Sequence, residues 1–100
     1  MDEEPITKQV AYVNRIHKTL IDMKGKRLRV RANLGRSKII EREGTLMQAH
    51  NSLFIMEVDE KRGRKARQSF QYVDVLTGTV ELTDLDNGAR LFPELQEEIF

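Results

Sequence analysis

Arginine occupies every second position of the segment RLRVRA at residues 27–32, and the residues between the arginines are apolar. An extended strand points alternate side chains to opposite faces, so this segment predicts a half-buried strand with one face of guanidinium groups. Guanidinium forks bind phosphate and carboxylate groups bidentately. The chemistry that this face would perform is recognition of an anionic partner. The competing interpretation is a solvated charged face that protects a strand from aggregation.

Further basic residues extend this row and form a second cluster. Residues 24–42 contain eight Lys or Arg against one acid, and residues 61–67 contain five with no acid. Residues 74–100 contain seven acids and one arginine, so the net charge of +1 conceals a basic middle and an acidic C-terminal part. Such segregation predicts a patterned surface that attracts anionic partners. The predicted anionic-partner site consists of Arg27, Arg29, Arg31, Asn33, Arg36, Lys38, Arg42, Lys61, Arg62, Arg64, Lys65 and Arg67.

Residue types that catalyse reactions are scarce. The chain has no cysteine and two histidines, neither of which has a His, Asp or Glu at metal-ligand spacing. His17 falls within an apolar stripe, so we expect a hydrogen-bonded core or interface histidine, and His50 lies in a predicted turn, where we expect solvation. Glu41 and Glu43 share one strand face, where neutralisation by the arginine row is the better account than catalysis. We expect no enzyme, cofactor or metal.

Two kinds of partner fit a basic face. A nucleic-acid backbone would be bound through phosphate contacts that weaken steeply with salt. An acidic protein surface is the alternative. Single-stranded nucleic acid usually stacks on aromatic rings, but Phe70 and Tyr72 are expected in the core. Both partner classes stay open.

An N-terminal helix is predicted at residues 7–24, and Gly25 is its natural end. A helix of this length needs a docked apolar stripe for stability. The stripe expected at helical spacing consists of Ile6, Val10, Val13, His17, Leu20 and Ile21.

Five short strands are predicted after the helix, with a polar hairpin tip at residues 59–65 and a short turn at residues 73–78. Gly44 inside the second strand predicts a bend or bulge. A mainly β chain of this kind favours a small five-stranded antiparallel barrel of the Sm-like or SH3-like type over a sandwich. The strands are expected at residues 26–32, 38–48, 52–58, 66–72 and 79–82, and the core at Leu28, Val30, Leu46, Phe54, Met56, Phe70, Val80 and Leu82.

The hundred residues predict one domain, 1–100, with an acidic tail at 1–5, the helix at 6–24, the barrel at 26–83 and a C-terminal tail at 84–100. The N-terminus lacks an apolar signal-peptide core, and no apolar run approaches the roughly 18 residues of a membrane span. We therefore expect a cytoplasmic protein. The third strand is apolar on both faces, which predicts extra buried surface and a homodimer.

The element order resembles the Sm-like barrel, in which a one-turn helix precedes the last strand. Gly44-Thr45-Leu46 is similar to the first Sm signature. Where Sm proteins carry an Asp and then an Asn that grip a base, this chain has His50 and Phe54. The resemblance therefore implies the barrel and not the uridine pocket.

A more specific resemblance covers residues 18–83. The strings GKRLRVRANLGRSKIIEREGTL and SFQYVDVLTGTVEL resemble the Veg family, small proteins of Gram-positive bacteria named for stimulating biofilm formation. The resemblance implies no enzymatic activity, and a role in matrix-gene expression through opposition to a transcriptional repressor. A regulatory protein-interaction module is thus the first hypothesis, a nucleic-acid-binding regulator the second and a homo-oligomeric scaffold the third. The distinctive elements are Gly25-Lys26-Arg27, Ala32-Asn33, Gly35-Arg36, Glu41-Arg42, Gly44 and Val80-Glu81-Leu82.

Overall fold

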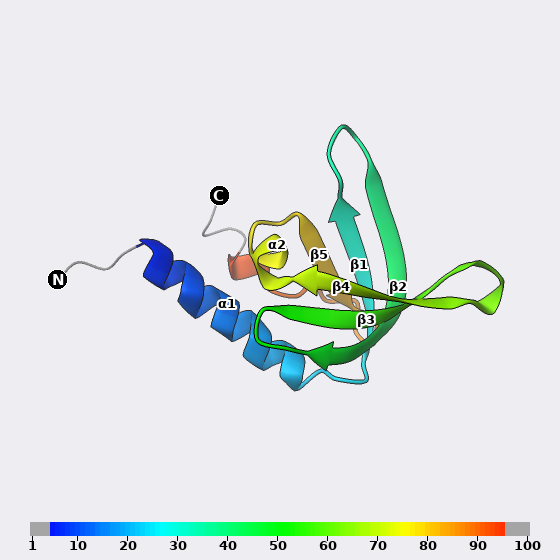
Figure 1. The fold of residues 1–100 in the computed structure, drawn as a ribbon, viewed down its shortest axis with the longest axis horizontal. Helices are drawn as coiled ribbons and strands as arrows, with labels where there is room; N and C mark the ends of the chain where they lie inside the picture. Colours follow the sequence, from blue (N-terminus) through cyan, green and yellow to red (C-terminus); the bar gives the residue numbers. More distant parts are fainter. Residues whose placement is uncertain (1–4, 96–100) are drawn as a thin grey trace.

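A computed structural model describes residues 5–95, with side chains from residue 8 onward. One N-terminal helix, α1 (Pro5–Ile21), precedes a strongly bent antiparallel sheet (Figure 1). A short 3-10 turn, η1 (Lys61–Gly63), and a five-residue helix, α2 (Tyr72–Leu76), interrupt the strands. The strands are β1 (Arg27–Asn33), β2 (Ile39–Ala49), β3 (Leu53–Asp59), β4 (Lys65–Gln71) and β5 (Val80–Asp84).

The strands lie in the order β4-β3-β2-β1-β5, and every neighbouring pair is antiparallel. This confirms the predicted mainly β fold with five antiparallel strands and an N-terminal helix. The sheet is not closed, because this order leaves β4 and β5 as its two edge strands among the described residues. The short helix α2 contacts both of these strands instead. The architecture is a small, bent, incompletely closed barrel.

The bend of β2 depends on two neighbouring features. The sequence predicted a bend or bulge at Gly44. The pairing of β2 with β3 shifts register slightly later, between Leu46 and Gln48. Gly44 itself is buried, and a Cβ there would lie 2.4 Å from the carbonyl oxygen of Glu57. The glycine therefore permits a close approach of β3 to β2 at the start of the bend.

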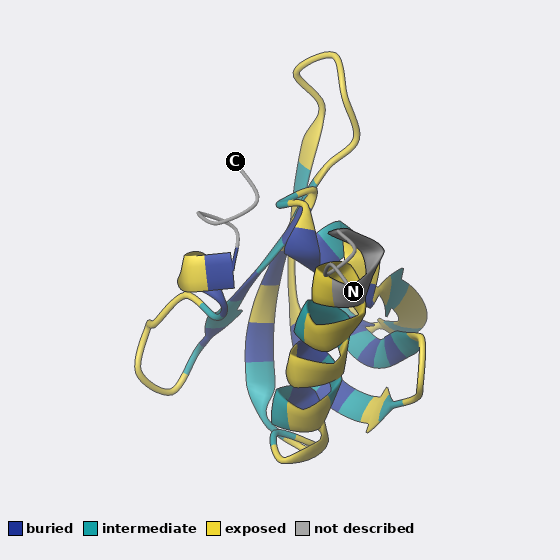
Figure 2. Cartoon of the chain, turned by 90° about the vertical axis from the view of Figure 1, so that its left-hand side faces the viewer, coloured by how far each residue is buried: buried dark blue, intermediate teal, exposed yellow. Residues whose placement is uncertain are grey.

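The core fills the concave side of the sheet, and buried residues alternate with more exposed ones along β1, β3 and β5 (Figure 2). This alternation confirms the predicted register, with Leu28 and Val30 inside and the arginines outside. Seven of the eight expected core residues are buried, and Phe70 is half-buried. The short turn expected at residues 73–78 contains most of α2, which adds Tyr72, Val75 and Leu76 to the core.

The expected apolar stripe of the helix is partly wrong. Val10 and Ile21 are 53% and 49% exposed, whereas Ile16, which we left out of the stripe, is fully buried. The helix docks on α2 and β2 along only part of its length, and its N-terminal part extends beyond the sheet (Figure 1). The positions of α2 and β2 therefore determine which side of α1 is buried. The side chain of Ile6 lies outside the described side chains.

The segment after Asp84 also packs more extensively than a tail. Phe92 and Leu95 are buried in the core, and residues 93–95 are helical. The chain returns along β5, since the Leu91 N–H donates to the Leu82 carbonyl at 2.8 Å. An ion pair of 2.8 Å between Arg15 and Glu94 connects this segment to α1.

Candidate anion-binding surface

The arginine row of β1 lies on the outer face of the sheet, as predicted, and carboxylates of the neighbouring strands oppose it. Arg29 pairs in register with Glu43, and its Nη2 lies 2.9 Å from Glu43 Oε2. Arg31 lies between Glu41 on β2 and Glu81 on β5, with nitrogen–oxygen distances of 3.7 Å to each. The expected neutralisation of Glu41 and Glu43 by the row is confirmed.

The third arginine of the row reaches further. Arg27 binds Asp59 with two nitrogens, and Lys65 approaches the same carboxylate from β4 at 3.0 Å. Hydrogen bonds from Arg27, and secondarily from Lys65, lower the pKa of Asp59 to about 2. Four of the predicted site residues (Arg27, Arg29, Arg31 and Lys65) thus each have a carboxylate partner within the protein.

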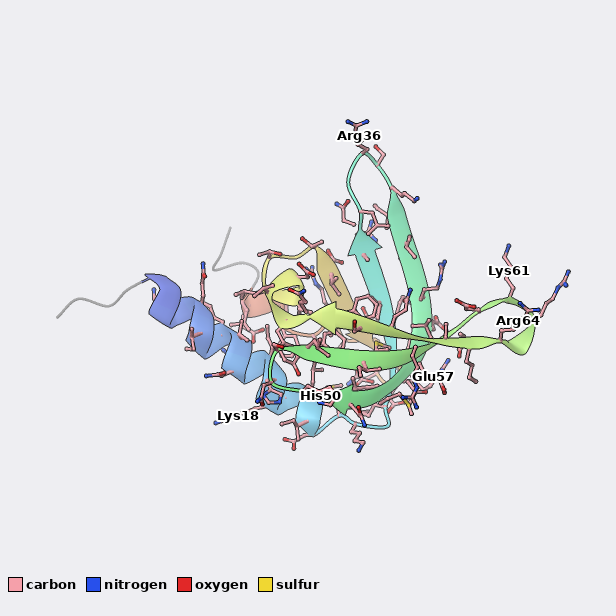
Figure 3. All side chains as sticks on the ribbon, in the orientation of Figure 1. Lys18, Arg36, His50, Glu57, Lys61 and Arg64 are labelled. Atoms are coloured by element: carbon pink, nitrogen blue, oxygen red, sulfur yellow. The ribbon has the colours of Figure 1, made fainter. Side chains whose placement is uncertain are left out.

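The tip of the β1–β2 hairpin carries basic side chains that, unlike those of the arginine row, have no carboxylate partner among the described side chains. Residues 33–39 are all exposed, and the tip projects away from the sheet (Figure 2). Asn33 shapes this turn, because its Oδ1 accepts a hydrogen bond from the Gly35 N–H at 2.9 Å. Arg36 extends from the end of the tip (Figure 3), and neither Arg36 nor Lys38 has an ion pair among the described side chains.

The tip of the β3–β4 hairpin forms the second basic projection. Lys61 and Arg64 lie at its end and extend outward (Figure 3). Arg62 has φ 62° and ψ 33°, in the left-handed region that costs an ordinary L-residue about 1–2 kcal/mol. Arg36 at the other tip also has a positive φ, of 49°. Both hairpins therefore place an arginine where glycine or asparagine would be less strained.

The two tips project in different directions, so the predicted site is divided rather than one continuous face (Figure 1). An open groove of about 780 Å³ lies between β2 and the β3–β4 hairpin. Arg42 lines it from β2, and among the described residues its guanidinium donates to the neighbouring Glu41 carbonyl alone, at 2.9 Å. The groove is lined by Glu41, Arg42, Glu43, Asp59, Glu60, Lys61, Arg62 and Arg64.

The charges in this groove do not cancel. Glu41, Glu43 and Asp59 are already bound by arginines from β1, which lie outside the groove lining. In the part of the chain whose side chains are described, the four cations of the lining have no carboxylate partner. The arginine row thus pairs three of the four carboxylates of the groove, all except Glu60, and leaves its cations available to an external anion. Arg67, the remaining predicted residue, is exposed on β4.

The two histidines lie where the sequence predicted them. His17 is half-buried, and its Nε2 lies 3.3 Å from the Ala49 carbonyl oxygen, which can only accept a hydrogen bond. His50 is exposed, with its Nε2 2.9 Å from Gln48 Oε1. Among the described residues no group of three His, Asp or Glu side chains could hold a metal ion, and no helix is long and apolar enough to cross a membrane.

A buried carboxylate escaped the sequence analysis. Asp84 ends β5 and accepts hydrogen bonds from the Asp86 N–H at 2.9 Å and from Lys26 Nζ at 3.1 Å. The Asp86 N–H, followed by Lys26, lowers the pKa of Asp84 below its usual range. The available signal was the turn-forming string DLDNG at residues 84–88. This arrangement fixes the turn after β5 and lies apart from the groove.

Comparison with known proteins gives a family. A family model described as Biofilm formation stimulator VEG matches residues 11–83. The chain belongs to this family. The match covers most of α1, both basic hairpins and β5 except its last residue, whereas the packed segment after Asp84 lies outside it. A search of curated proteins finds no match.

Proposed function

We propose that this protein is a non-enzymatic, cytoplasmic regulatory binding protein that stimulates biofilm formation. In this proposal it acts on matrix-gene transcription by binding a regulatory protein, with a transcriptional repressor as the expected target. Membership of the Veg family supports the link to biofilm formation. The observation that carries the binding role is the groove whose four cations have no carboxylate partner among the described side chains, while three of its four carboxylates are paired with arginines of β1.

The mixed lining of the groove favours a protein partner. A nucleic-acid backbone presents only negative charge, and it would meet four carboxylates together with four cations. A protein surface can place its own carboxylates against Arg42 and Arg64 and its own donors against Glu60. Arginine forks also bind carboxylates in a defined geometry, which gives partner selectivity as well as attraction.

A nucleic-acid partner is the second candidate, and one observation favours it. The unpaired cations at the two hairpin tips form two separate basic arms. Exposed cations that lie apart from each other suit contacts with phosphate groups better than the compact core of a protein interface. Binding of this kind would weaken steeply with salt and would depend little on sequence. In this alternative the two arms, rather than the groove, would make the contacts.

Affinity capture from a Gram-positive lysate, with and without nuclease, tests the proposal. The informative variant is Arg62→Glu/Arg64→Glu, and the matched control is Lys18→Glu/Lys24→Glu, which reverses the same charge on exposed residues away from the groove. We expect a protein that is captured despite nuclease, lost with the hairpin variant and retained with the helix variant. Capture that nuclease abolishes would establish the second candidate. Equal capture by both variants would contradict a role for the groove.

A further inference from the structure

The two edges of the sheet differ in how far they are covered. At β5, the outward carbonyl of Leu82 accepts from the Leu91 N–H, and the outward N–H of Asp84 donates to the Ala89 carbonyl at 2.9 Å. The returning segment thus covers this edge. At β4, the only strand partner among the described residues is β3. The seven residues of β4 are therefore an uncovered edge, which is a template for an added strand.

The hydrogen-bonding pattern of the β3–β4 hairpin determines which backbone groups of β4 point toward its open edge. The Glu60 N–H donates to the Arg64 carbonyl at 2.7 Å, which makes this a hydrogen-bonded pair. Bonded and non-bonded pairs alternate along an antiparallel ladder, and the register of β3 with β4 runs without a shift to Gln71. The N–H and C=O groups of Lys65, Arg67 and Ser69 therefore point away from β3, toward the open edge.

The side chains along this edge define what would pair with it. Lys65 and Arg67 lie on the outer face of the sheet, on the same side as the arginine row. The inner-face residues Ala66 and Phe70 are half-buried, and Phe70 stacks on Phe54 with ring centroids 5.6 Å apart. An added strand would have one face beside cations and the other beside apolar groups.

We infer that the β4 edge binds an extended segment of the regulatory protein in which acidic and apolar residues alternate. This inference rests on the proposed function and specifies its mode of binding, which is strand addition. The edge continues into Arg64 and the groove, so one acidic segment can contact both. A second copy of this chain is a poor occupant, because pairing of two β4 strands would bring Lys65 and Arg67 of both copies onto one face.

A defined peptide tests this directly. The probe is a seven-residue peptide of alternating glutamate and valine, the length of β4. The control peptide has the same composition with the glutamates grouped at one end, so that charge is kept and alternation is lost. We expect the alternating peptide to bind about tenfold more tightly by fluorescence anisotropy, which corresponds to one charge-assisted hydrogen bond that the control peptide cannot form. Equal binding of the two peptides, or binding of neither, would overturn the inference.

Two variants test the backbone pairing and the side-chain charge separately. Ser69→Pro removes one outward N–H and keeps the bonds to β3, since proline is tolerated at edge positions. It should weaken the alternating peptide by up to about tenfold, as expected for the loss of one hydrogen bond, while circular dichroism stays unchanged. Arg67→Glu leaves the backbone intact and should transfer the preference to an alternating lysine–valine peptide. Wild-type binding by a folded Ser69→Pro variant, or an Arg67→Glu variant that still prefers the acidic peptide, would contradict the inference.

The same variants separate this inference from the proposed function. Nuclease-resistant capture that depends on Arg62 and Arg64 and is unaffected by Ser69→Pro would reject strand addition and keep the protein-binding function. Capture that nuclease abolishes would reject the function itself. Sedimentation of the protein alone tests whether a second copy of the chain occupies the β4 edge. A dimer that Ser69→Pro dissociates would assign the edge to self-association and overturn the inference.

Discussion

Arg27 on β1 binds the carboxylate of Asp59 on β3 across the intervening strand β2, and its Nη1 also lies 3.4 Å from Thr45 Oγ1 on that strand. Asp59 is the last residue of β3, directly before the basic hairpin tip. The contact therefore joins strands that do not pair with each other and fixes the base of the hairpin. Arg27 has a positioning role for the groove in addition to its charge.

The Arg27–Asp59 contact predicts a specific acid dependence. The pKa of Asp59 is about 2 in the folded protein against an ordinary value of 3.8, so its stabilising effect is complete above pH 3.8 and is lost as pH falls through 2. We expect Asp59→Asn to be less stable than wild type at neutral pH and to lose less stability over that interval. Urea unfolding at several pH values measures both. Parallel pH profiles for the two proteins would contradict the prediction.

Reversal of Arg29 tests the ion pairs of the outer face. On sequence alone, an exposed strand position predicts little change in stability, but the structure places Arg29 opposite Glu43 at 2.9 Å. Arg29→Glu would set two carboxylates directly opposite each other, and we expect a loss of roughly 0.2–1 kcal/mol. The exchange Arg29→Glu/Glu43→Arg should restore most of it. Chemical denaturation of the three proteins measures the effect, and failure of the exchange to restore stability would exclude the pairing.

The alternation of polar and apolar residues was the most reliable signal in the sequence for the strands and their register. The alternation of arginine and apolar residues from Arg27 to Ala32 fixed both the register and the outward face, because a slip by one residue would bury three guanidinium groups. The pairing of Glu41 and Glu43 with that row followed from the same alternation. These local patterns were sufficient because β1 has one buried face and one face open to solvent.

Features that depend on distant contacts could not be read from the sequence. The side of α1 that becomes buried is decided by where α2 and β2 lie, so helical spacing alone did not distinguish Ile16 from Val10. The core residues Phe92 and Leu95 lie in an acidic segment without a clear period. The separation of the basic residues into paired and unpaired groups required the positions of Asp59 and Glu81, which come from other strands.

Gly44 offers a test of the bend in β2. A methyl group at this position would lie 2.4 Å from the Glu57 carbonyl oxygen and 2.8 Å from Val58 Cα, and both are backbone atoms that cannot move aside alone. We expect Gly44→Ala to destabilise the fold by about 1–3 kcal/mol. Ser69→Ala, at an exposed site on β4, is the control and should change little. Equal stability of Gly44→Ala and wild type would show that β3 can move away from β2.

Tyr72 predicts a change of stability at high pH. Tyr72 is buried and its hydroxyl donates a hydrogen bond to the His50 carbonyl, and desolvation raises the pKa of this hydroxyl from 10.0 to about 12. Its contribution is complete below pH 10.0 and is lost as pH rises toward 12. We expect Tyr72→Phe to be less stable by about 1 kcal/mol at neutral pH and to lack this alkaline component. Thermal unfolding at neutral and alkaline pH measures the difference, which should narrow as the pH rises.

The left-handed conformation of Arg62 separates its effect on stability from its effect on binding. Asparagine adopts φ near 62° more readily than arginine does, so Arg62→Asn should stabilise the fold by less than about 1 kcal/mol. Arg64 has φ −75°, and Arg64→Asn should bring no such gain. If the tip serves binding, both variants should lose affinity for the captured partner, although only the first becomes more stable. A thermal shift assay combined with affinity capture tests this, and unchanged capture by both variants would leave the two arginines without a binding role.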